Sequence, residues 1–325
     1  MQIQASSGRA PSRGVIAASI ALLIVVWAVN FVAGKTGLRF IPVLTLASFR
    51  VVLAGAVMLP VYLLCSRLPA FAEATNARRR GFTGRDLWTF LYLGFFGVTV
   101  NQMCFTVGLR YTPVSHASLI VGMGPIYTLV LAVLLRLELA TWRKATGMAI
   151  ALAGIAVMAS ENGISAHSPS LLGDVITMTG SIGFAMYVVL GKRVAEKYDT
   201  LTMTAFNHFA GALIVLPLAI RQAGALGAAE NWRAIPWSSW TALFYMAVFS
   251  SAIAYVFYFW LLRYLEASQL SAFSYLLPLV ATILGTVWLG EKGSWGQVLG
   301  GALALGGLYW IEAGREPVVK ANTVS

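Results

Sequence analysis

Apolar runs of about twenty residues recur along the whole chain, separated by short polar segments. A helix needs roughly 20 residues to cross the hydrocarbon core of a bilayer, so each run of that length predicts one spanning helix. The pattern therefore predicts an all-α integral membrane protein with ten transmembrane helices. The predicted helices cover 15–34, 43–63, 87–109, 114–135, 144–160, 171–190, 201–220, 237–260, 268–289 and 295–312.

The composition agrees with this pattern, because 58% of the residues are hydrophobic and 11% are charged, whereas soluble chains carry about 25% charged residues. The net charge of +11 could suggest a nucleic-acid partner. However, the basic residues lie between apolar runs, and no basic face alternates with stacking aromatic residues. We therefore expect the lipid bilayer and a small-molecule substrate as partners, and no nucleic acid.

The distribution of lysine and arginine gives the expected orientation. With ten helices, 16 of the 23 basic residues fall on the side of the N-terminus and six on the other side. Because loops rich in Lys and Arg remain in the cytoplasm, both termini are predicted to be cytoplasmic. The composition, rich in Arg, Ala and Gly, favours a bacterial inner membrane.

The two halves of the chain resemble each other. The stretch GLRYTPVSHAS at 108–118 matches LLRYLEASQLS at 261–271, 153 residues further on, and Gly34-Lys35 matches Gly191-Lys192, 157 residues further on. Each half has five predicted helices, so the second half enters the membrane from the opposite side, as in transporters with inverted repeats. The predicted organisation is a tail at 1–14, a first repeat at 15–160, a second repeat at 171–312 and a tail at 313–325.

Longer motifs in both halves resemble the EamA family of the drug/metabolite transporter superfamily. In the first half these are WAVNFVAGK, LASFR and GLRYTPVSHASLIVGMGPIYTLVLAVLLRLELATWRKATGMAIALAGI, and in the second LLRYLEASQLSAFSYLLPLVATILGTVWLGEKGSWGQVLGGALALGGL. The second copy keeps Leu289-Gly290-Glu291, whereas the first copy has Leu135-Arg136-Leu137 before Glu138 and so departs from that triplet. The resemblance covers about residues 15–312. It implies ten helices, a central cavity open to one side at a time, and export of small organic metabolites.

Arg50 is the basic residue that lies inside a predicted helix. A charge there costs about 2.5–3.5 kcal/mol on insertion scales, so it normally faces a cavity or a partner. Its guanidinium could hold a substrate carboxylate with two parallel hydrogen bonds. The alternative is a structural contact with helix-end carbonyls or with a loop carboxylate.

Other polar or amphipathic residues within the predicted helices are candidates for lining the same cavity. Asn207 occupies the position equivalent to Arg50 in the second half, and His208 follows it. For each candidate the alternative is a hydrogen bond between helices, which contributes only about 0.6 kcal/mol on average. The remaining substrate-binding candidates are Asn30, Asn101, Tyr187, Tyr255, Tyr258 and Tyr275.

Proton coupling has three candidates. His208 could titrate near neutrality within the membrane, and His116 lies at the start of a helix where interfacial water can reach it. Asp174 is the acidic residue nearest to a helix interior, although a charge near a helix N-terminus has a simple structural explanation. No Asp or Glu lies in the middle of a predicted helix, which disfavours an exporter that exchanges protons for organic cations.

These features together predict a secondary transporter that exports small organic metabolites, with amino acids or their derivatives as the first expectation. Alternatives are an exporter of drugs or quaternary ammonium cations and, in a different class, a lipid flippase or scramblase. The loops are too short for a catalytic domain and carry no metal-ligand cluster, so we expect neither an enzyme nor a cofactor. Small residues four apart, at Gly147 and Ala151 and at Gly296 and Gly300, could pack helices within the chain or form a homodimer.

Overall fold

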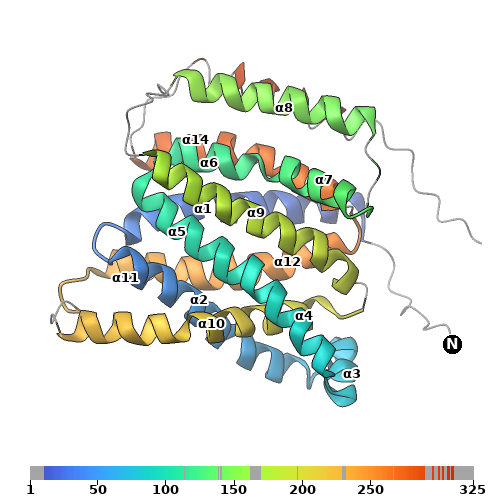
Figure 1. Ribbon diagram of the computed structural model, residues 1–325, viewed down its shortest axis with the longest axis vertical. Coiled ribbons are helices and arrows are strands. Elements are labelled where there is room, and N and C mark those ends of the chain that lie inside the picture. The colour runs from blue at the N-terminus through green and yellow to red at the C-terminus, as the bar shows by residue number, and fades with distance from the viewer. Residues whose placement is uncertain are drawn as a thin grey trace, which may run out of the picture.

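The computed structural model is entirely helical in the part of the chain that it describes (Figure 1). The predicted all-α fold is therefore confirmed for that part, whereas the predicted helix 295–312 lies largely outside it. The described residues are 11–112, 114–137, 139, 141–161, 170–195, 197–228, 232–265 and 267–289, with residues 295, 299, 300, 302, 303, 306, 307, 309 and 310 beyond them.

The described part of the first half contains eight α-helices, and π-helical turns at Phe95–Val100 join α4 to α5 without a break. Its helices are α1 (Arg13–Gly37), α2 (Val43–Cys65), α3 (Ala72–Arg80), α4 (Gly84–Gly94), α5 (Asn101–Tyr111), α6 (Val114–Gly122), α7 (Gly124–Leu134) and α8 (Trp142–Glu161). Figure 1 shows α8 as the outermost of these helices at the top of the molecule.

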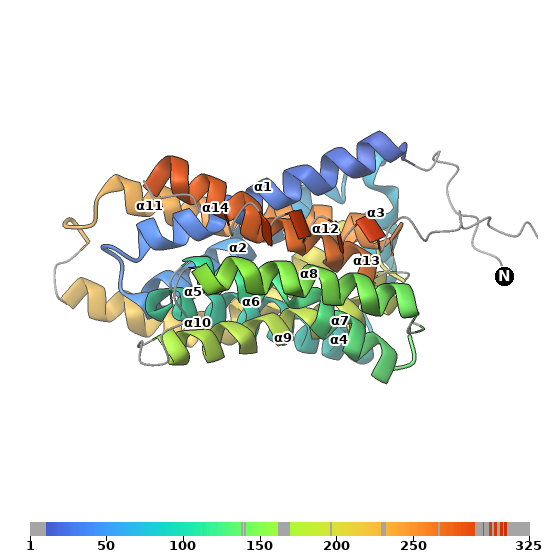
Figure 2. The same ribbon diagram turned by 90° about the horizontal axis from the view of Figure 1, so that it is seen from above.

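The second half repeats this order, and π-helical turns at Met246–Ile253 join α11 to α12. Its described helices are α9 (Ser170–Ala195), α10 (Thr200–Ala228), α11 (Trp237–Tyr245), α12 (Ala254–Leu262), α13 (Ala267–Ala272) and α14 (Leu276–Leu289). In Figure 2, α1 and α14 lie along one face of the molecule and α9 along the opposite face.

Equivalent helices begin at the positions that the sequence repeat assigns. α9 and α10 start 157 residues after α1 and α2, while α11 and α13 start 153 residues after α4 and α6. The contacts follow the same relation, since α1 packs against α11 and α12 while α9 packs against α5. The halves thus share their local structure as well as their sequence pattern.

Two of the predicted helices are interrupted. The segment predicted as one helix at 114–135 consists of α6 and α7, which are separated at Met123. Pro125 lies two residues further on, in the first turn of α7, and its ring and missing N–H prevent an uninterrupted helix. The segment predicted at 268–289 is divided by a 3₁₀ turn at Phe273–Tyr275, and Pro278, the equivalent of Pro125, follows that turn near the start of α14.

A lysine near the end of each half's first helix binds the C-terminal carbonyls of a later helix. Lys35 Nζ donates to the carbonyls of Leu109 (2.8 Å) and Thr112 (3.0 Å). In the second half, Lys192 Nζ donates to the equivalent carbonyls, those of Leu262 and of Leu265 (2.7 Å for the latter). Because the last carbonyls of a helix lack intrahelical donors and carry a partial negative charge, each ammonium stabilises a helix end.

We expect Lys35→Met and Lys192→Met to lower the thermal midpoint of the purified protein by similar amounts. Each substitution removes charge-assisted hydrogen bonds, which contribute about 1.5–3 kcal/mol apiece. The measurement is thermal unfolding in mild detergent, with Arg39→Met, at an exposed site, as the control. A loss in one lysine variant without a comparable loss in the other would show that the two contacts are not equivalent.

The helices α2 and α10 pack closely against each other. A Cβ atom built on Gly55 would lie 2.5 Å from the Cβ of Ala212 and 2.8 Å from the carbonyl oxygen of His208. Small residues at such a point let two helix backbones approach each other. This contact places Arg50 of α2 and His208 of α10 in the same central region.

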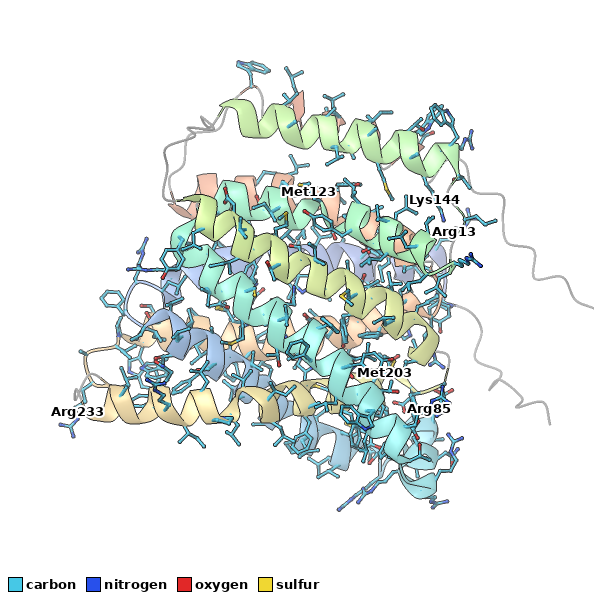
Figure 3. The ribbon with its side chains drawn as sticks, viewed as in Figure 1. Arg13, Arg85, Met123, Lys144, Met203 and Arg233 are labelled. Carbon is cyan, nitrogen blue, oxygen red and sulfur yellow. The ribbon has the colours of Figure 1, made fainter. Side chains whose placement is uncertain are left out.

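Six described helical segments are long and apolar enough to cross a membrane, and two shorter apolar ones accompany them. Figure 3 shows Arg13, Arg85 and Lys144 at one end of the molecule and Arg233 at the opposite end. The six segments are Arg13–Gly37, Val43–Cys65, Gly84–Tyr111, Leu172–Lys192, Thr200–Gly227 and Trp237–Leu262, and the shorter ones are Ile120–Leu134 and Leu270–Ala281.

Two ion pairs between described residues connect the halves. Lys197 Nζ lies 2.6 Å from Asp86 Oδ1, and Arg263 lies 3.3 Å from Glu73. The hydrogen bond that Lys197 Nζ donates to the Asp86 carboxylate raises the pKa of the Lys197 ammonium group. Since the Lys197 side chain is largely exposed, water screens this attraction and the pair adds little to stability.

Candidate functional site

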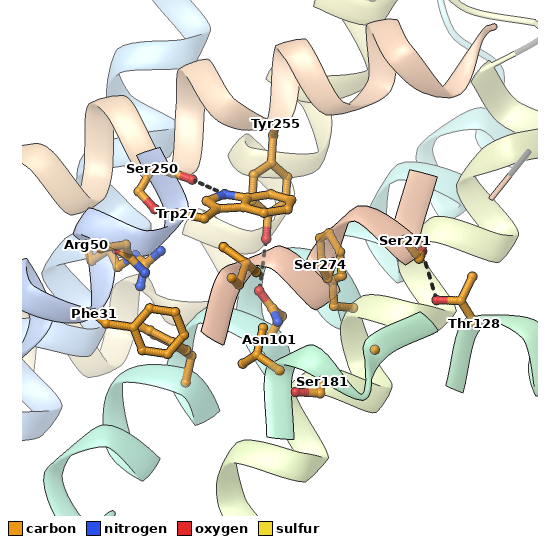
Figure 4. A pocket seen from close by; sticks show the side chains of 16 residues that line it. Trp27, Phe31, Arg50, Asn101, Thr128, Ser181, Ser250, Tyr255, Ser271 and Ser274 are labelled. Carbon is orange, nitrogen blue, oxygen red and sulfur yellow. Dashed lines mark hydrogen bonds between the residues drawn. The ribbon is translucent and has the colours of Figure 1, made fainter. Parts of the chain in front are cut away.

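A central cavity of about 80 Å³ lies between helices of both halves (Figure 4). In Figure 4, Arg50 and Phe31 lie at one end, Ser271 and Thr128 at the other, and Trp27 and Tyr255 between them. The cavity is lined by Trp27, Asn30, Phe31, Arg50, Asn101, Phe105, Val121, Gly124, Thr128, Ser181, Phe184, Ser250, Tyr255, Ser271, Ser274 and Leu277.

Arg50 reaches the cavity from α2 and is 4% exposed. Its Nε donates to Ser251 Oγ at 3.1 Å, and its guanidinium carbon lies 5.5 Å from the centre of the Phe105 ring. One terminal nitrogen, Nη1, has no hydrogen-bond partner within the described structure, and no described carboxylate forms an ion pair with Arg50. A buried guanidinium in this state is well suited to bind an anionic group.

Gln102 is connected to Arg50 through Ser251, and the sequence analysis did not identify it. Ser251, which accepts the hydrogen bond from Arg50, lies with its Oγ 2.9 Å from Gln102 Oε1. The Gln102 amide nitrogen is buried and lacks a partner among the described residues. The sequence did contain a signal, because Gln102 is equivalent to Tyr255 in the repeat, and Tyr255 was a candidate.

Asn30, Asn101 and Tyr255 line the cavity as the sequence predicts. Tyr255 Oη lies 2.9 Å from both the Gly97 carbonyl and Asn101 Oδ1, and Asn101 Nδ2 donates to the Gly180 carbonyl at 3.1 Å. Asn30 is buried, and its Oδ1 accepts no hydrogen bond from any described group. Asn101 and Tyr255 are therefore fixed by the protein, whereas Asn30 keeps an acceptor available.

Aromatic side chains form the middle of the cavity, and sequence reasoning missed two of them. Trp27 Nε1 donates to the Ser250 carbonyl at 3.2 Å, and the Trp27 ring contacts Phe184 edge to face at 5.6 Å between centroids. Trp27 and Phe184 occupy equivalent positions, 157 residues apart. An aromatic pair at equivalent positions within the predicted helices was the signal that could have identified them.

The other predicted substrate-binding residues lie next to this lining. Asn207 Nδ2 donates to Tyr187 Oη at 3.2 Å, and the Tyr187 ring packs against Tyr255 at 5.7 Å. Tyr258 contacts Trp27 at 5.5 Å and lies with its hydroxyl 3.4 Å from Ser271 Oγ. Tyr187 and Tyr258 thus pack against the lining residues Tyr255 and Trp27, and Asn207 holds the hydroxyl of Tyr187.

Tyr275 and the coupling candidates occupy different surroundings. Tyr275 is fully buried, packs with Leu129 and Met148, and has a hydroxyl without a described partner. The Asp174 carboxylate accepts a hydrogen bond from the Thr112 hydroxyl near the start of α9 and does not line the cavity. His116 belongs to α6, but its side chain lies outside the described part.

His208 is the coupling candidate that contacts a residue of the cavity wall, Tyr255. Its ring packs edge to face on Tyr255 at 4.9 Å, and Nδ1 lies 2.9 Å from the Thr204 carbonyl. A carbonyl accepts only, so Nδ1 carries a proton and donates it. The other ring nitrogen, Nε2, is buried without a partner in the described chain and can accept a proton.

Comparisons with known proteins identify the family to which the chain belongs. The sequence profile of the EamA-like transporter family matches residues 12–160 and again residues 171–313. The chain belongs to the EamA-like transporter family. It is therefore a multi-pass membrane protein of a transporter family, as the sequence motifs predict.

Relatives of this EamA-like transporter are similar over nearly their whole length. An uncharacterized transporter of Archaeoglobus fulgidus is 25% identical over 89% of this chain and 96% of its own. A probable terminal-alkyne amino-acid exporter of Streptantibioticus cattleyicolor is 26% identical over 90% of this chain and 92% of its own. One solved crystal structure, 18% identical, has a TM-score of 0.66 over 92% of this chain and 96% of that one, which concerns the fold alone.

The site of this EamA-like transporter combines one positively charged side chain, that of Arg50, with neutral polar and aromatic groups. Among its described lining residues there is no Asp or Glu. Such a cavity can bind an anionic group at Arg50 and neutral or apolar groups along Trp27 and Tyr255. No described carboxylate of the lining can pair with a permanent organic cation, although the aromatic rings can contact one.

Proposed function

We propose that this protein is a secondary active exporter of small organic metabolites that carry a carboxylate, with amino acids or their derivatives as the first class. The observation that carries the proposal is Arg50, whose buried guanidinium faces the cavity with one nitrogen unpaired. The amino-acid exporter among the relatives supports the same substrate class. Arg50 would hold the substrate carboxylate, and Asn30 would accept a hydrogen bond from a polar group of the substrate.

The proposed mechanism is alternating access by two inverted five-helix repeats, ten helices in all. The equivalent helix starts and the matching contacts of Lys35 and Lys192 support the repeat. In this arrangement the substrate site lies near the membrane midplane at the repeat interface, where Arg50 and Tyr255 meet. We further propose a bacterial inner membrane location with both termini cytoplasmic, because most basic residues lie on the side of the N-terminus.

The proposal is tested by substrate counterflow into proteoliposomes. Labelled amino acids and organic cations are compared, each with and without a pH gradient. Saturable exchange of amino acids, competed by unlabelled amino acids, is the expected result. Exchange of cations alone would contradict the carboxylate site and favour a cation exporter.

We expect His208→Gln to remove most of the pH dependence of transport while leaving exchange at equal pH on both sides active. The reason is that Nε2 is a buried acceptor beside the cavity wall, able to take a proton in one access state. The measurement is counterflow with and without a pH gradient across the membrane. His116→Gln serves as the comparison, and full pH dependence in the His208 variant would reject the coupling role.

A further inference from the structure

Three side chains that line the central cavity each leave one polar atom without a hydrogen-bond partner in the described structure. These atoms are Arg50 Nη1, Asn30 Oδ1 and Ser250 Oγ. All three residues are buried, none being more than 5% exposed. Since a buried polar atom without a hydrogen bond is costly, a ligand that pairs with all three atoms would bind favourably.

The contacts around Ser250 connect Arg50 with Asn30. Ser250 belongs to the π-helical turns between α11 and α12, and such turns are frequent at functional sites. The next residue, Ser251, accepts the hydrogen bond from Arg50 Nε. The Ser250 carbonyl accepts the hydrogen bond from Trp27 Nε1 (Figure 4), and Asn30 follows Trp27 by three residues on the same side of α1. Arg50, Ser250 and Asn30 therefore lie around one part of the cavity.

The internal repeat shows how the side chains at these positions face each other. The residues equivalent to Arg50, Asn30 and Ser250 are Asn207, Tyr187 and Gly97. Asn207 Nδ2 donates to Tyr187 Oη at 3.2 Å, and a Cβ atom built on Gly97 would lie 2.1 Å from the Tyr187 ring. This second set is in direct contact and does not belong to the described lining of the cavity. By the same relation Arg50 faces Asn30, but both of these line the cavity and neither bonds the other.

The three unpaired atoms match the polar groups of an α-amino acid. Arg50 Nη1 is a charged donor, which pairs well with a carboxylate. Asn30 Oδ1 and Ser250 Oγ can both accept hydrogen bonds, and an ammonium group has three protons to donate. A hydroxyl in place of the ammonium has one proton, so it would leave one of the two acceptors unpaired. The carboxylate of the same substrate offsets the charge of its ammonium group.

We propose that the cavity selects substrates with a free α-ammonium group beside the carboxylate. Asn30 and Ser250 bind the ammonium group while Arg50 binds the carboxylate. This inference rests on the transport function proposed above, and it goes further because it separates amino acids from hydroxy acids of the same size. Asn30 and Ser250 are thereby the residues that determine the specificity at the α position.

The test compares carboxylates that differ only at the α position. Labelled alanine, leucine and phenylalanine are paired with labelled lactate, 2-hydroxyisocaproate and 3-phenyllactate, and the KM for counterflow into proteoliposomes is measured for each. Every amino acid that is exchanged is expected to have a KM at least tenfold below that of its hydroxy analogue, because hydrogen bonds to a charged group are the stronger ones.

The outcomes separate this inference from the proposed function. Equal KM values within the pairs, or exchange of the hydroxy acids alone, would overturn the inference and leave the export of carboxylates standing. Exchange of none of the six compounds would contradict both.

Two variants test whether Asn30 and Ser250 make the distinction. Asn30→Leu and Ser250→Ala each remove one acceptor, so the tenfold preference for the amino acid is expected to fall to about threefold or less. Asn76→Leu, at an exposed position of α3, is the control and should keep the preference. The ratio compares two compounds on one preparation, so a smaller amount of folded protein does not change it.

A purely structural role of either residue would raise both KM values of a pair together and leave their ratio unchanged. An unchanged ratio in Asn30→Leu and Ser250→Ala would therefore overturn the proposed ammonium site. If Asn30→Leu does not fold, the ratio in Ser250→Ala decides.

Discussion

Replacing Arg50 with Gln is expected to reduce amino-acid counterflow by about ten- to a hundredfold at substrate concentrations well below saturation. A hydrogen bond to a charged group contributes about 1.5–3 kcal/mol, and each 1.4 kcal/mol changes binding tenfold. Gln keeps the polarity and much of the length of the side chain but removes the positive charge. The loss should therefore appear in substrate affinity rather than in the amount of folded protein.

A series at this position separates binding from folding. Arg50→Lys keeps the charge, but it loses the planar fork that pairs with both carboxylate oxygens, so we expect an intermediate activity. Arg110→Gln changes an exposed arginine at the end of α5 and should leave transport unchanged. Thermal unfolding in detergent is measured alongside, because a loss of folded Arg50→Gln protein would favour a structural role for Arg50.

The positions of the helices could be predicted from the sequence because the apolar runs and the repeat agree with each other. The ends of α2 and α9 lie within a few residues of the predictions. The interruption at Met123 was not predicted, although Pro125 was visible within the apolar run. Hydropathy gives the length of an apolar segment, but whether a proline bends or breaks a helix depends on the groups packed around it.

The candidate site could be predicted only in part. Arg50, Asn30 and Asn101 stand out because polar groups inside apolar helices are rare, and all three line the cavity. Trp27 does not stand out in this way, since an aromatic residue in an apolar helix usually packs against a neighbour or lipid. Gln102 could not be assigned to Arg50, because the contact passes through Ser251 on a distant helix.

Substituting Gly55 with Ala is expected to destabilise the protein strongly, by about 1–3 kcal/mol, as overpacking in tightly packed interiors does. The added methyl group would meet the Cβ of Ala212 and the carbonyl oxygen of His208. Neither atom belongs to the end of a flexible side chain, so the helices α2 and α10 must move apart. That movement also displaces Arg50 from His208 and Ser251, so transport should fall together with stability.

The matched control for Gly55 is Gly224→Ala, a second glycine of the α2–α10 pair, where a Cβ would meet nothing within 4 Å. Its backbone does not adopt a positive φ, so alanine is tolerated, and its greater helix propensity should leave the thermal midpoint unchanged or slightly higher. The measurement is thermal unfolding in mild detergent together with counterflow. Equal thermal midpoints for both variants would mean that α2 and α10 can separate at little cost in free energy. The contact between these two helices would then be mobile and not rigid.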